Sequence, residues 1–134
     1  MSKKIALVTD GATGIGAAVC TELVTQDIQV AVFDINKTTG KDLHKEIGAE
    51  FIECDVTKLV SVQEAIRLCT EKLGVPDYVH LNAGIMTVPT GDPFLAIEDV
   101  TEAQYQKIVS VNLNGIFYGV KTLLPLMRDK GGTV

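Results

Sequence analysis

The sequence predicts an α/β fold, in which a parallel sheet is covered by helices on both faces. Short apolar runs typical of buried strands alternate along the chain with segments whose apolar residues recur at helical spacing. Such alternation is typical of parallel strands joined by right-handed helical crossovers. A glycine-rich turn, residues 10–16, separates the first apolar run from the first helical segment, and Asp34 closes the second apolar run. Together these observations favour a doubly wound sheet.

Composition excludes several classes of protein. The chain has 134 residues, of which 46% are hydrophobic, so residues 1–134 are expected to form one globular domain. The net charge of −5 argues against nucleic acid or an anionic membrane as partner, and no apolar run reaches the ~20 residues of a membrane span. The three cysteines lack C-x-x-C spacing, which predicts reduced thiols, no metal site and a cytoplasmic protein.

The apolar patterns set the expected boundaries of the elements. Strands are expected over residues 5–9, 28–33, 50–54 and 78–81, and helices over 14–26, 36–48, 61–73 and 101–127. In the first helix, Ile15, Ala18, Val19 and Leu23 fall on one face and are expected to pack on the sheet. Residues 85–100 carry two prolines and a glycine and should form a long loop beside a ligand crevice.

Several residues are expected to begin or end these helices. Asn36 is placed to cap the second helix, and Asp27, after the first, can adopt a left-handed conformation. Ser61 and Thr101 are each followed three residues later by Glu or Gln, which is the spacing of a capping box. Pro125 is expected to bend the last helix.

The glycine-rich turn predicts an anion site. A strand, a glycine turn and a helix N-terminus together point free backbone N–H groups and the positive end of the helix dipole at a phosphate. Asp34 follows about twenty residues later, where the ribose hydroxyls of a dinucleotide would lie. An ordinary strand–helix turn is the alternative interpretation of the same glycines.

Four short motifs occur in order along the chain. They are TDGATGIG at residues 9–16, DVT at 55–57, NAG at 82–84, and VNLNG at 111–115, which contains an N-x-x-G pattern. In these motifs the chain resembles the short-chain dehydrogenase/reductase family, whose cofactor motif is T-G-x-x-x-G-x-G. The resemblance implies a Rossmann-type sheet of strand order 3-2-1-4. It also implies an oxidoreductase that transfers hydride between a secondary alcohol or ketone and a nicotinamide cofactor.

The resemblance assigns roles to individual residues. The cofactor-binding residues it implies are Thr13, Gly14, Ile15, Gly16, Asp34, Asp55, Val56, Asn82, Ala83 and Gly84. Asn112 resembles the family's active-site asparagine, which holds a water in a proton relay. Asp34 would bind both ribose hydroxyls and repel a 2′-phosphate, and Thr13 supplies no compensating positive charge, so NAD is expected in preference to NADP.

The chain departs from the family pattern in two places. Asp10 stands where the motif has its first glycine, and a carboxylate within ~4–6 Å of a pyrophosphate would oppose binding by one to a few kcal/mol. The second departure is that the catalytic serine and the Tyr-x-x-x-Lys pair have no counterpart; the residues four positions after the three tyrosines are Asn82, Val109 and Thr122. The chain is therefore expected to be the amino-terminal, NAD-binding part of a longer enzyme and to be inactive alone.

Two other functions compete with this interpretation. A non-catalytic nucleotide-binding or interaction module would fit Asp10 and the missing catalytic residues. A methyltransferase with a similar glycine turn is disfavoured because three further motifs occur together. Self-association is also expected, through the open edge of the fourth strand and an apolar helix face. The residues of that face are Val109, Leu113, Ile116, Phe117, Val120 and Leu124.

Overall fold

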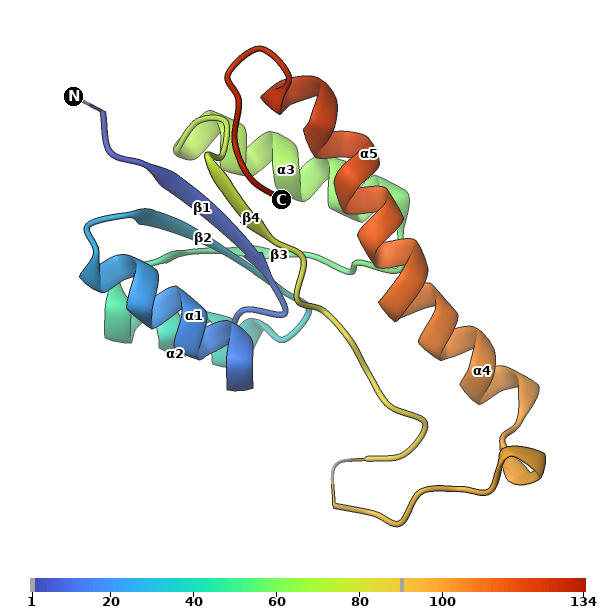
Figure 1. Ribbon diagram of the computed structural model, residues 1–134. Coiled ribbons are helices and arrows are strands. Elements are labelled where there is room, and N and C mark those ends of the chain that lie inside the picture. The colour runs from blue at the N-terminus through green and yellow to red at the C-terminus, as the bar shows by residue number, and fades with distance from the viewer. Residues whose placement is uncertain (1, 90) are drawn as a thin grey trace.

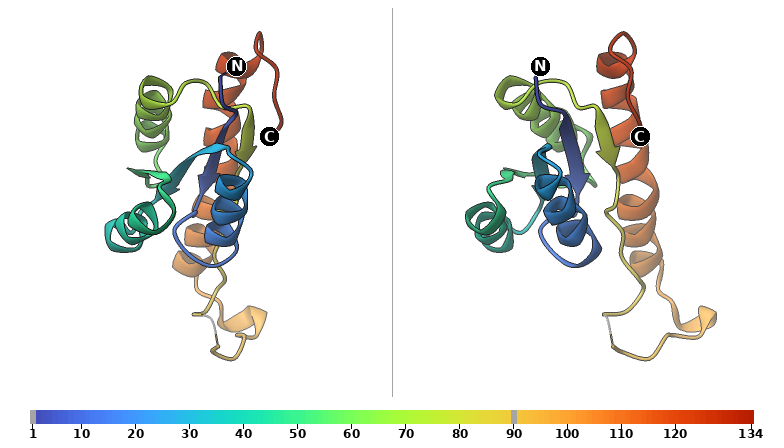
Figure 2. Two further views of the ribbon diagram at one scale, coloured as in Figure 1. Left: turned by 90° about the vertical axis from the view of Figure 1, so that its left-hand side faces the viewer. Right: turned by 60° about the vertical axis from the view of Figure 1, so that its left-hand side comes forward.

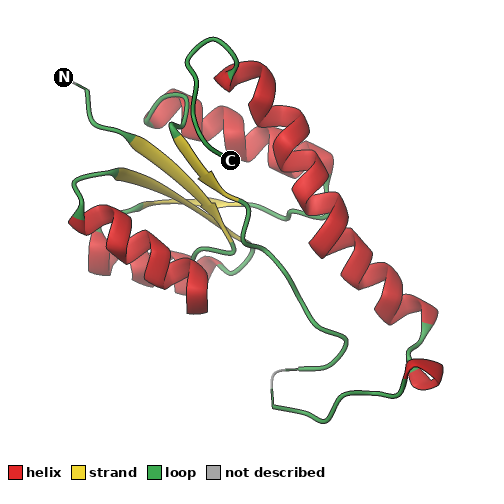
Figure 3. Ribbon diagram, viewed as in Figure 1, coloured by secondary structure: helices red, strands yellow, loops and turns green. Residues whose placement is uncertain are grey.

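The computed structural model describes residues 2–89 and 91–134 and has an α/β architecture (Figures 1 and 3). The strands within these ranges are β1 (Ile5–Thr9), β2 (Gln29–Asp34), β3 (Glu50–Glu53) and β4 (Tyr78–His80). The helices there are α1 (Gly14–Thr25), α2 (Lys37–Ile47), α3 (Leu59–Lys72), α4 (Glu102–Ile108) and α5 (Gly115–Met127). A 3₁₀ turn (Ile97–Asp99) precedes α4, and a π-helical turn (Val109–Asn114) joins α4 to α5.

The sheet has the predicted topology. Its strand order is β3-β2-β1-β4, and each neighbouring pair is parallel. In the register, Leu7 of β1 lies opposite Ala31 of β2 on one side and Val79 of β4 on the other. Both the fold class and the strand order expected from the sequence are therefore confirmed.

Alternate residues of the central strands face two separate hydrophobic cores. Leu7 belongs to the core that α3 and α5 cover, whereas its neighbour Val8 belongs to the core beneath α1 and α2. Figures 1 and 2 show these two helical layers on opposite faces of the sheet. Because β1 and β2 are buried on both faces, they consist of continuous apolar runs rather than alternating ones.

The inward face of α1 is only partly the predicted one: Val19 and Leu23 pack against the core as expected, but Ile15 and Ala18 do not. Ile15 is 75% exposed and Ala18 is also exposed, whereas Gly16 and Cys20 are buried. The reason is the close approach of α1 to the preceding turn, since a Cβ atom on residue 16 would lie 2.2 Å from the Asp10 carbonyl oxygen. The helix is therefore rotated so that glycine faces the turn, and the larger Ile15 is left outside.

The start of α3 also differs from the prediction. The helix begins at Leu59, and Ser61 lies inside its first turn instead of capping it. The Ser61 hydroxyl instead accepts a hydrogen bond of 2.9 Å from the Asp55 backbone N–H, so it holds the segment that leads out of β3. The predicted capping box at Thr101 is confirmed, as are the Asn36 cap and the left-handed backbone of Asp27.

The last helical segment is not the uninterrupted α-helix that the sequence predicts. The π-helical turn interrupts it where two glycines bring the chain close to the sheet layer. A Cβ on Gly115 would lie 3.2 Å from Val56, and one on Gly119 would lie 2.8 Å from Leu81. Pro125 lies within α5. Such π turns insert one extra residue per turn and frequently occur at functional sites.

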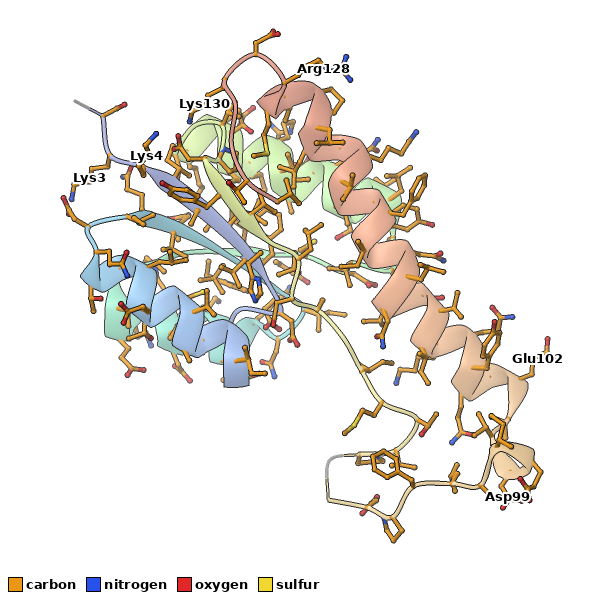
Figure 4. All side chains as sticks on the ribbon, in the orientation of Figure 1. Lys3, Lys4, Asp99, Glu102, Arg128 and Lys130 are labelled. Carbon is orange, nitrogen blue, oxygen red and sulfur yellow. The ribbon has the colours of Figure 1, made fainter. Side chains whose placement is uncertain are left out.

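An ionic cluster holds the amino end of the sheet together. The Asp77 carboxylate accepts hydrogen bonds from Lys4 (2.9 Å), the Ile5 N–H (3.0 Å) and Lys130 (3.2 Å), and Figure 4 shows the two lysines at this end. Burial alone would raise the pKa of Asp77, but these bonds outweigh it and lower the pKa to about 2. Thr133 then pairs in parallel with Tyr78 at the outer edge of β4.

Candidate functional site

The candidate site lies at the carboxyl ends of the strands, where the turns after β1, β2, β3 and β4 meet. A cavity of about 700 Å³ opens at this edge. Its lining comprises Asp10, Asp34, Ile35, Cys54, Asp55, Val56, Thr57, Lys58, Ala83, Gly84, Ile85, Lys107, Ser110 and Val111. A crevice at the carboxyl edge of a doubly wound sheet is the usual ligand position in this architecture.

The glycine-rich turn brings the start of α1 close to β1. Gly14 has φ +55°, a conformation that favours glycine, and Gly16 is the point of closest approach. Thr13 occupies the N-cap position, but its side chain accepts no hydrogen bond from the helix. The N-terminus of α1, including Ile15, therefore remains available to an anion. Thr13, Gly14, Ile15 and Gly16 lie beside the cavity rather than in its lining.

Asp34 is held rigidly at the end of β2. The residue is 6% exposed, and its Oδ2 accepts a 3.1 Å hydrogen bond from the Ala12 N–H while Oδ1 accepts one of 2.9 Å from Asn36. Each oxygen retains a further acceptor site that a ribose hydroxyl can use. Lys37, the nearby lysine in the sequence, pairs with Glu53 at 2.9 Å. Its positive charge is thus already partnered outside the cavity.

Asp55 and Val56 form the wall that follows β3. Asp55 Oδ1 accepts bonds of 3.0 Å from the Thr57 N–H and 2.6 Å from its hydroxyl, and Lys58 lies 3.3 Å from Oδ2. Partial burial pushes the pKa of Asp55 upward, but the bonds from Thr57 and the charge of Lys58 outweigh it, so the pKa lies below its ordinary value. Asp55 is therefore ionised at neutral pH.

The segment after β4 is attached to both neighbouring structures. The Ala83 N–H donates to the Thr9 hydroxyl at 3.1 Å, and the Asn82 side chain donates to the Asp10 carbonyl at 3.3 Å. Ala83 and Gly84 line the cavity, whereas Asn82 lies behind it as a support for the glycine turn. The three residues of the NAG motif thus connect the phosphate end of the site to its far wall.

Asn112 faces the same segment from the π-helical turn. Its Oδ1 accepts a 2.8 Å hydrogen bond from the Ile85 N–H, and its Nδ2 donates one of 2.9 Å to the Ile85 carbonyl. The side chain therefore works as a bidentate clamp that holds the long loop against the helix. It does not line the cavity. Both polar groups of the Asn112 side chain are thus engaged by the backbone of Ile85.

Several cavity residues were not predicted. Ile35 and Ser110 line it without belonging to a motif, although Ile35 is a large apolar residue that is 65% exposed immediately after Asp34. Val111 also lines it and begins the VNLNG motif, but it was not among the predicted site residues. Lys107 contributes a positive charge from α4. Asp10 also lines the cavity, and its carboxyl interacts with that of Asp34. From the sequence, such residues could have been found by their position next to a motif residue.

Comparison with known proteins identifies the family. Residues 4–134 match the family model described as short chain dehydrogenase, so the chain belongs to the short-chain dehydrogenase/reductase family. Zerumbone synthase from Zingiber zerumbet is 31% identical over 131 residues, which are 95% of this chain and 48% of that protein. The mitochondrial borneol dehydrogenase of Lavandula x intermedia is 32% identical over 132 residues, covering 98% of this chain and 49% of that protein.

Solved structures show the same fold. The 3-ketoacyl-(acyl-carrier-protein) reductase from Brucella melitensis, crystallised with NADH, superposes with a TM-score of 0.88 at 26% identity. The superposition covers 96% of this chain and 52% of that one. The chain thus spans about half the length of the relatives that it matches. None of the helices that the structure describes is long and apolar enough to cross a membrane.

Proposed function

We propose that residues 1–134 bind NAD(H) as the cofactor-binding part of an oxidoreductase. Membership of the family and the NADH-bound structural neighbour support a nicotinamide dinucleotide as the cofactor class. The observation that carries the preference for NAD is the buried Asp34 carboxylate, which stands in the cavity with its oxygens fixed by two backbone N–H groups. A fixed carboxylate accepts hydrogen bonds from a ribose diol and repels a 2′-phosphate.

The cavity suggests how the dinucleotide would lie. The pyrophosphate would occupy the N-terminus of α1 next to Gly14, where backbone N–H groups and the helix dipole favour an anion. The adenosine ribose would reach Asp34, and the adenine would pack between Ile35 and Val56 near the ionised Asp55. The nicotinamide half would then extend past Gly84 toward the loop that Asn112 holds.

For the whole protein, we propose reversible hydride transfer between a secondary alcohol or ketone and the nicotinamide. Residues 1–134 would hold and orient the cofactor, and Asn112 would fix the loop beside it. Reduction of a ketone also needs a proton donor at the developing alkoxide, which typically contributes ~10²–10⁴-fold. These 134 residues contain no Tyr-x-x-x-Lys pair. The polypeptide of residues 1–134 should therefore bind NADH without turning over any alcohol or ketone.

Titration calorimetry with NADH and NADPH tests the cofactor proposal. The wild-type chain should bind NADH more tightly, and Asp34→Ala should weaken NADH binding by about tenfold or more, because a charge-assisted hydrogen bond is lost. Asp42→Asn on the exposed face of α2 removes the same charge outside the cavity and serves as the matched control. Equal binding of the two dinucleotides, or an equal effect of both substitutions, would overturn the preference.

A non-catalytic nucleotide-binding module is the second candidate. Asp10 favours it, because a carboxylate in place of the motif's first glycine departs from the pattern of the family's catalytic members. The measurement that separates the two is NADH consumption, with ketones as substrates, by residues 1–134 joined to any further residues that the gene specifies. Turnover of ketones by that polypeptide supports the oxidoreductase, and tight NADH binding without turnover supports the module.

A further inference from the structure

Asp10 occupies an unusual position in the turn after β1. Its backbone has φ +52°, in the left-handed region that glycine adopts without cost. Among side chains other than glycine, Asp and Asn enter this region most readily, because their short polar groups can bond locally. The turn can therefore form with Asp10 in place of the usual glycine. What the substitution adds to the turn is a carboxylate.

That carboxylate belongs to the adenosine end of the site. Asp10 and Asp34 come from different elements, the turn after β1 and the end of β2, and both line the cavity. The pKa of Asp10 lies above its ordinary value because the carboxyl is partly buried and faces the Asp34 carboxylate. Thr13, Gly14 and Ile15, which would meet the pyrophosphate, are not part of the cavity lining.

Neighbouring cations do not neutralise this second carboxylate. Lys37 pairs with Glu53, and Lys58 pairs with Asp55. Asn82 reaches Asp10 only at its backbone carbonyl, 3.3 Å away. Within residues 2–89 and 91–134 no lysine or arginine forms an ion pair with Asp10 or Asp34. The cavity lining also holds Lys107, so a phosphate on the ribose would meet two carboxylates that no cation pairs with and one lysine from α4.

We propose that Asp10 is a second specificity-determining residue, which rejects a 2′-phosphorylated dinucleotide independently of Asp34. The proposal rests on the proposed function and extends it to a residue outside the usual acidic position. A phosphate within ~6 Å of a carboxylate in a partly buried site is disfavoured by about tenfold or more. Removing the Asp34 charge alone should therefore leave the site selective for NAD.

A double-mutant cycle tests this proposal. The variants are Asp34→Asn, Asp10→Asn and the double variant, and calorimetry gives the dissociation constants of NADH and NADPH for each. Asn tolerates a left-handed backbone, so Asp10→Asn removes charge without straining the turn. We expect Asp34→Asn to keep preferring NADH. The double variant should show a further fall of about tenfold in the ratio of the NADPH constant to the NADH constant.

Each outcome decides a separate question. If the wild type binds neither dinucleotide, the proposed function and this inference both fail. If the wild type binds NADH but Asp34→Asn and the double variant have the same ratio, only the inference fails. Urea unfolding of every variant shows whether it folds, and Asp10→Gly provides a second route to the uncharged turn. A ratio that changes with Asp10→Asn but not with Asp10→Gly would also overturn a charge-based role.

Discussion

Replacing Gly16 with Ala should damage both the stability of the chain and its dinucleotide site. The added Cβ would lie 2.2 Å from the Asp10 carbonyl oxygen and 2.8 Å from the Gly11 Cα, and it would also lie 3.0 Å from the Asn82 amide nitrogen. Two of these three atoms belong to the backbone of the turn. The clash therefore cannot be relieved by rotating a side chain, and α1 must move away from β1.

The size of the effect follows from these distances. Extending a 2.2 Å contact to an ordinary van der Waals separation requires a displacement of roughly 1 Å. Overpacking of this kind costs ~1–3 kcal/mol, and the higher helix propensity of Ala returns at most ~1 kcal/mol. We therefore expect the free energy of unfolding to fall by ~1–2 kcal/mol. NADH affinity should fall by about tenfold or more, because hydrogen bonds to the pyrophosphate weaken steeply with misalignment.

Gly40→Ala provides a matched control for this experiment. A Cβ there would also lie 2.2 Å from another atom, in this case on the ring of Phe51, in a helix that does not line the cavity. Urea unfolding should show that both variants are destabilised, while calorimetry with NADH should show a loss only for Gly16→Ala. The reasoning is refuted if Gly16→Ala retains wild-type affinity, or if both variants lose affinity in proportion to their lost stability.

Three further perturbations test other parts of the molecule. Asp77→Asn should lower the free energy of unfolding by about 1–2 kcal/mol at pH 7, after a discount for the exposed lysine partners. The pKa of Asp77 is about 2 in the folded chain, below the unfolded value of ~3.9. The difference in the free energy of unfolding between wild type and variant should therefore shrink as the pH falls from 4 to 2. A difference measured by urea unfolding that does not change with pH would contradict this. Phe117→Ser should reduce self-association in light scattering, because Phe117 and Leu113 are 58% and 64% exposed on one helix face; a monomeric wild type would contradict it. Asn112→Ala should speed hydrogen exchange of the Ile85 amide by about tenfold, since it removes that amide's 2.8 Å acceptor; unchanged exchange would contradict the clamp.

Local sequence patterns predicted the centre of the sheet because its two central strands are buried on both faces. A continuous apolar run such as β1 has the same meaning whichever way its side chains alternate, so the strands follow from the run lengths. The strand order, in contrast, was implied by the resemblance to the family. The rotation of α1 could not be predicted in this way. An apolar periodicity favours Ile15 as an inward residue together with Val19 and Leu23, but the close approach of Gly16 to the Asp10 carbonyl leaves Ile15 exposed while the other two pack on the core.

The predictions for the start of α3 and for an uninterrupted last helix were wrong for a related reason. Ser61 has capping-box spacing, yet its hydroxyl bonds the Asp55 N–H because the chain folds back over the end of β3. The π turn is followed at once by Gly115, whose close approach to Val56 is a contact that no window of a single helix contains. In both places a tertiary contact decides between local alternatives of similar energy.

The motif residues predicted which edge of the sheet carries the site. They did not predict which residues line the cavity. Asp34, Asp55 and Gly84 line it, whereas Asn82 and Asn112 support its walls. Strand ends converge by topology, so residues that follow strands can be placed from the sequence. The direction of an individual side chain depends on hydrogen bonds between separate segments, as in the bidentate contact of Asn112 with Ile85.

Asp10 shows how the two kinds of information combine. From the sequence, it breaks the glycine pattern in two ways, through the bulk of its side chain and through its charge. The backbone at φ +52° removes the first objection, because the turn adopts its left-handed conformation with Asp in place. Charge is then the difference that remains, and it lies at the cavity, where the Asp10 carboxyl interacts with that of Asp34. We therefore expect Asp10 to affect whether the site accepts a phosphorylated ribose more than it affects whether the turn can bind the pyrophosphate.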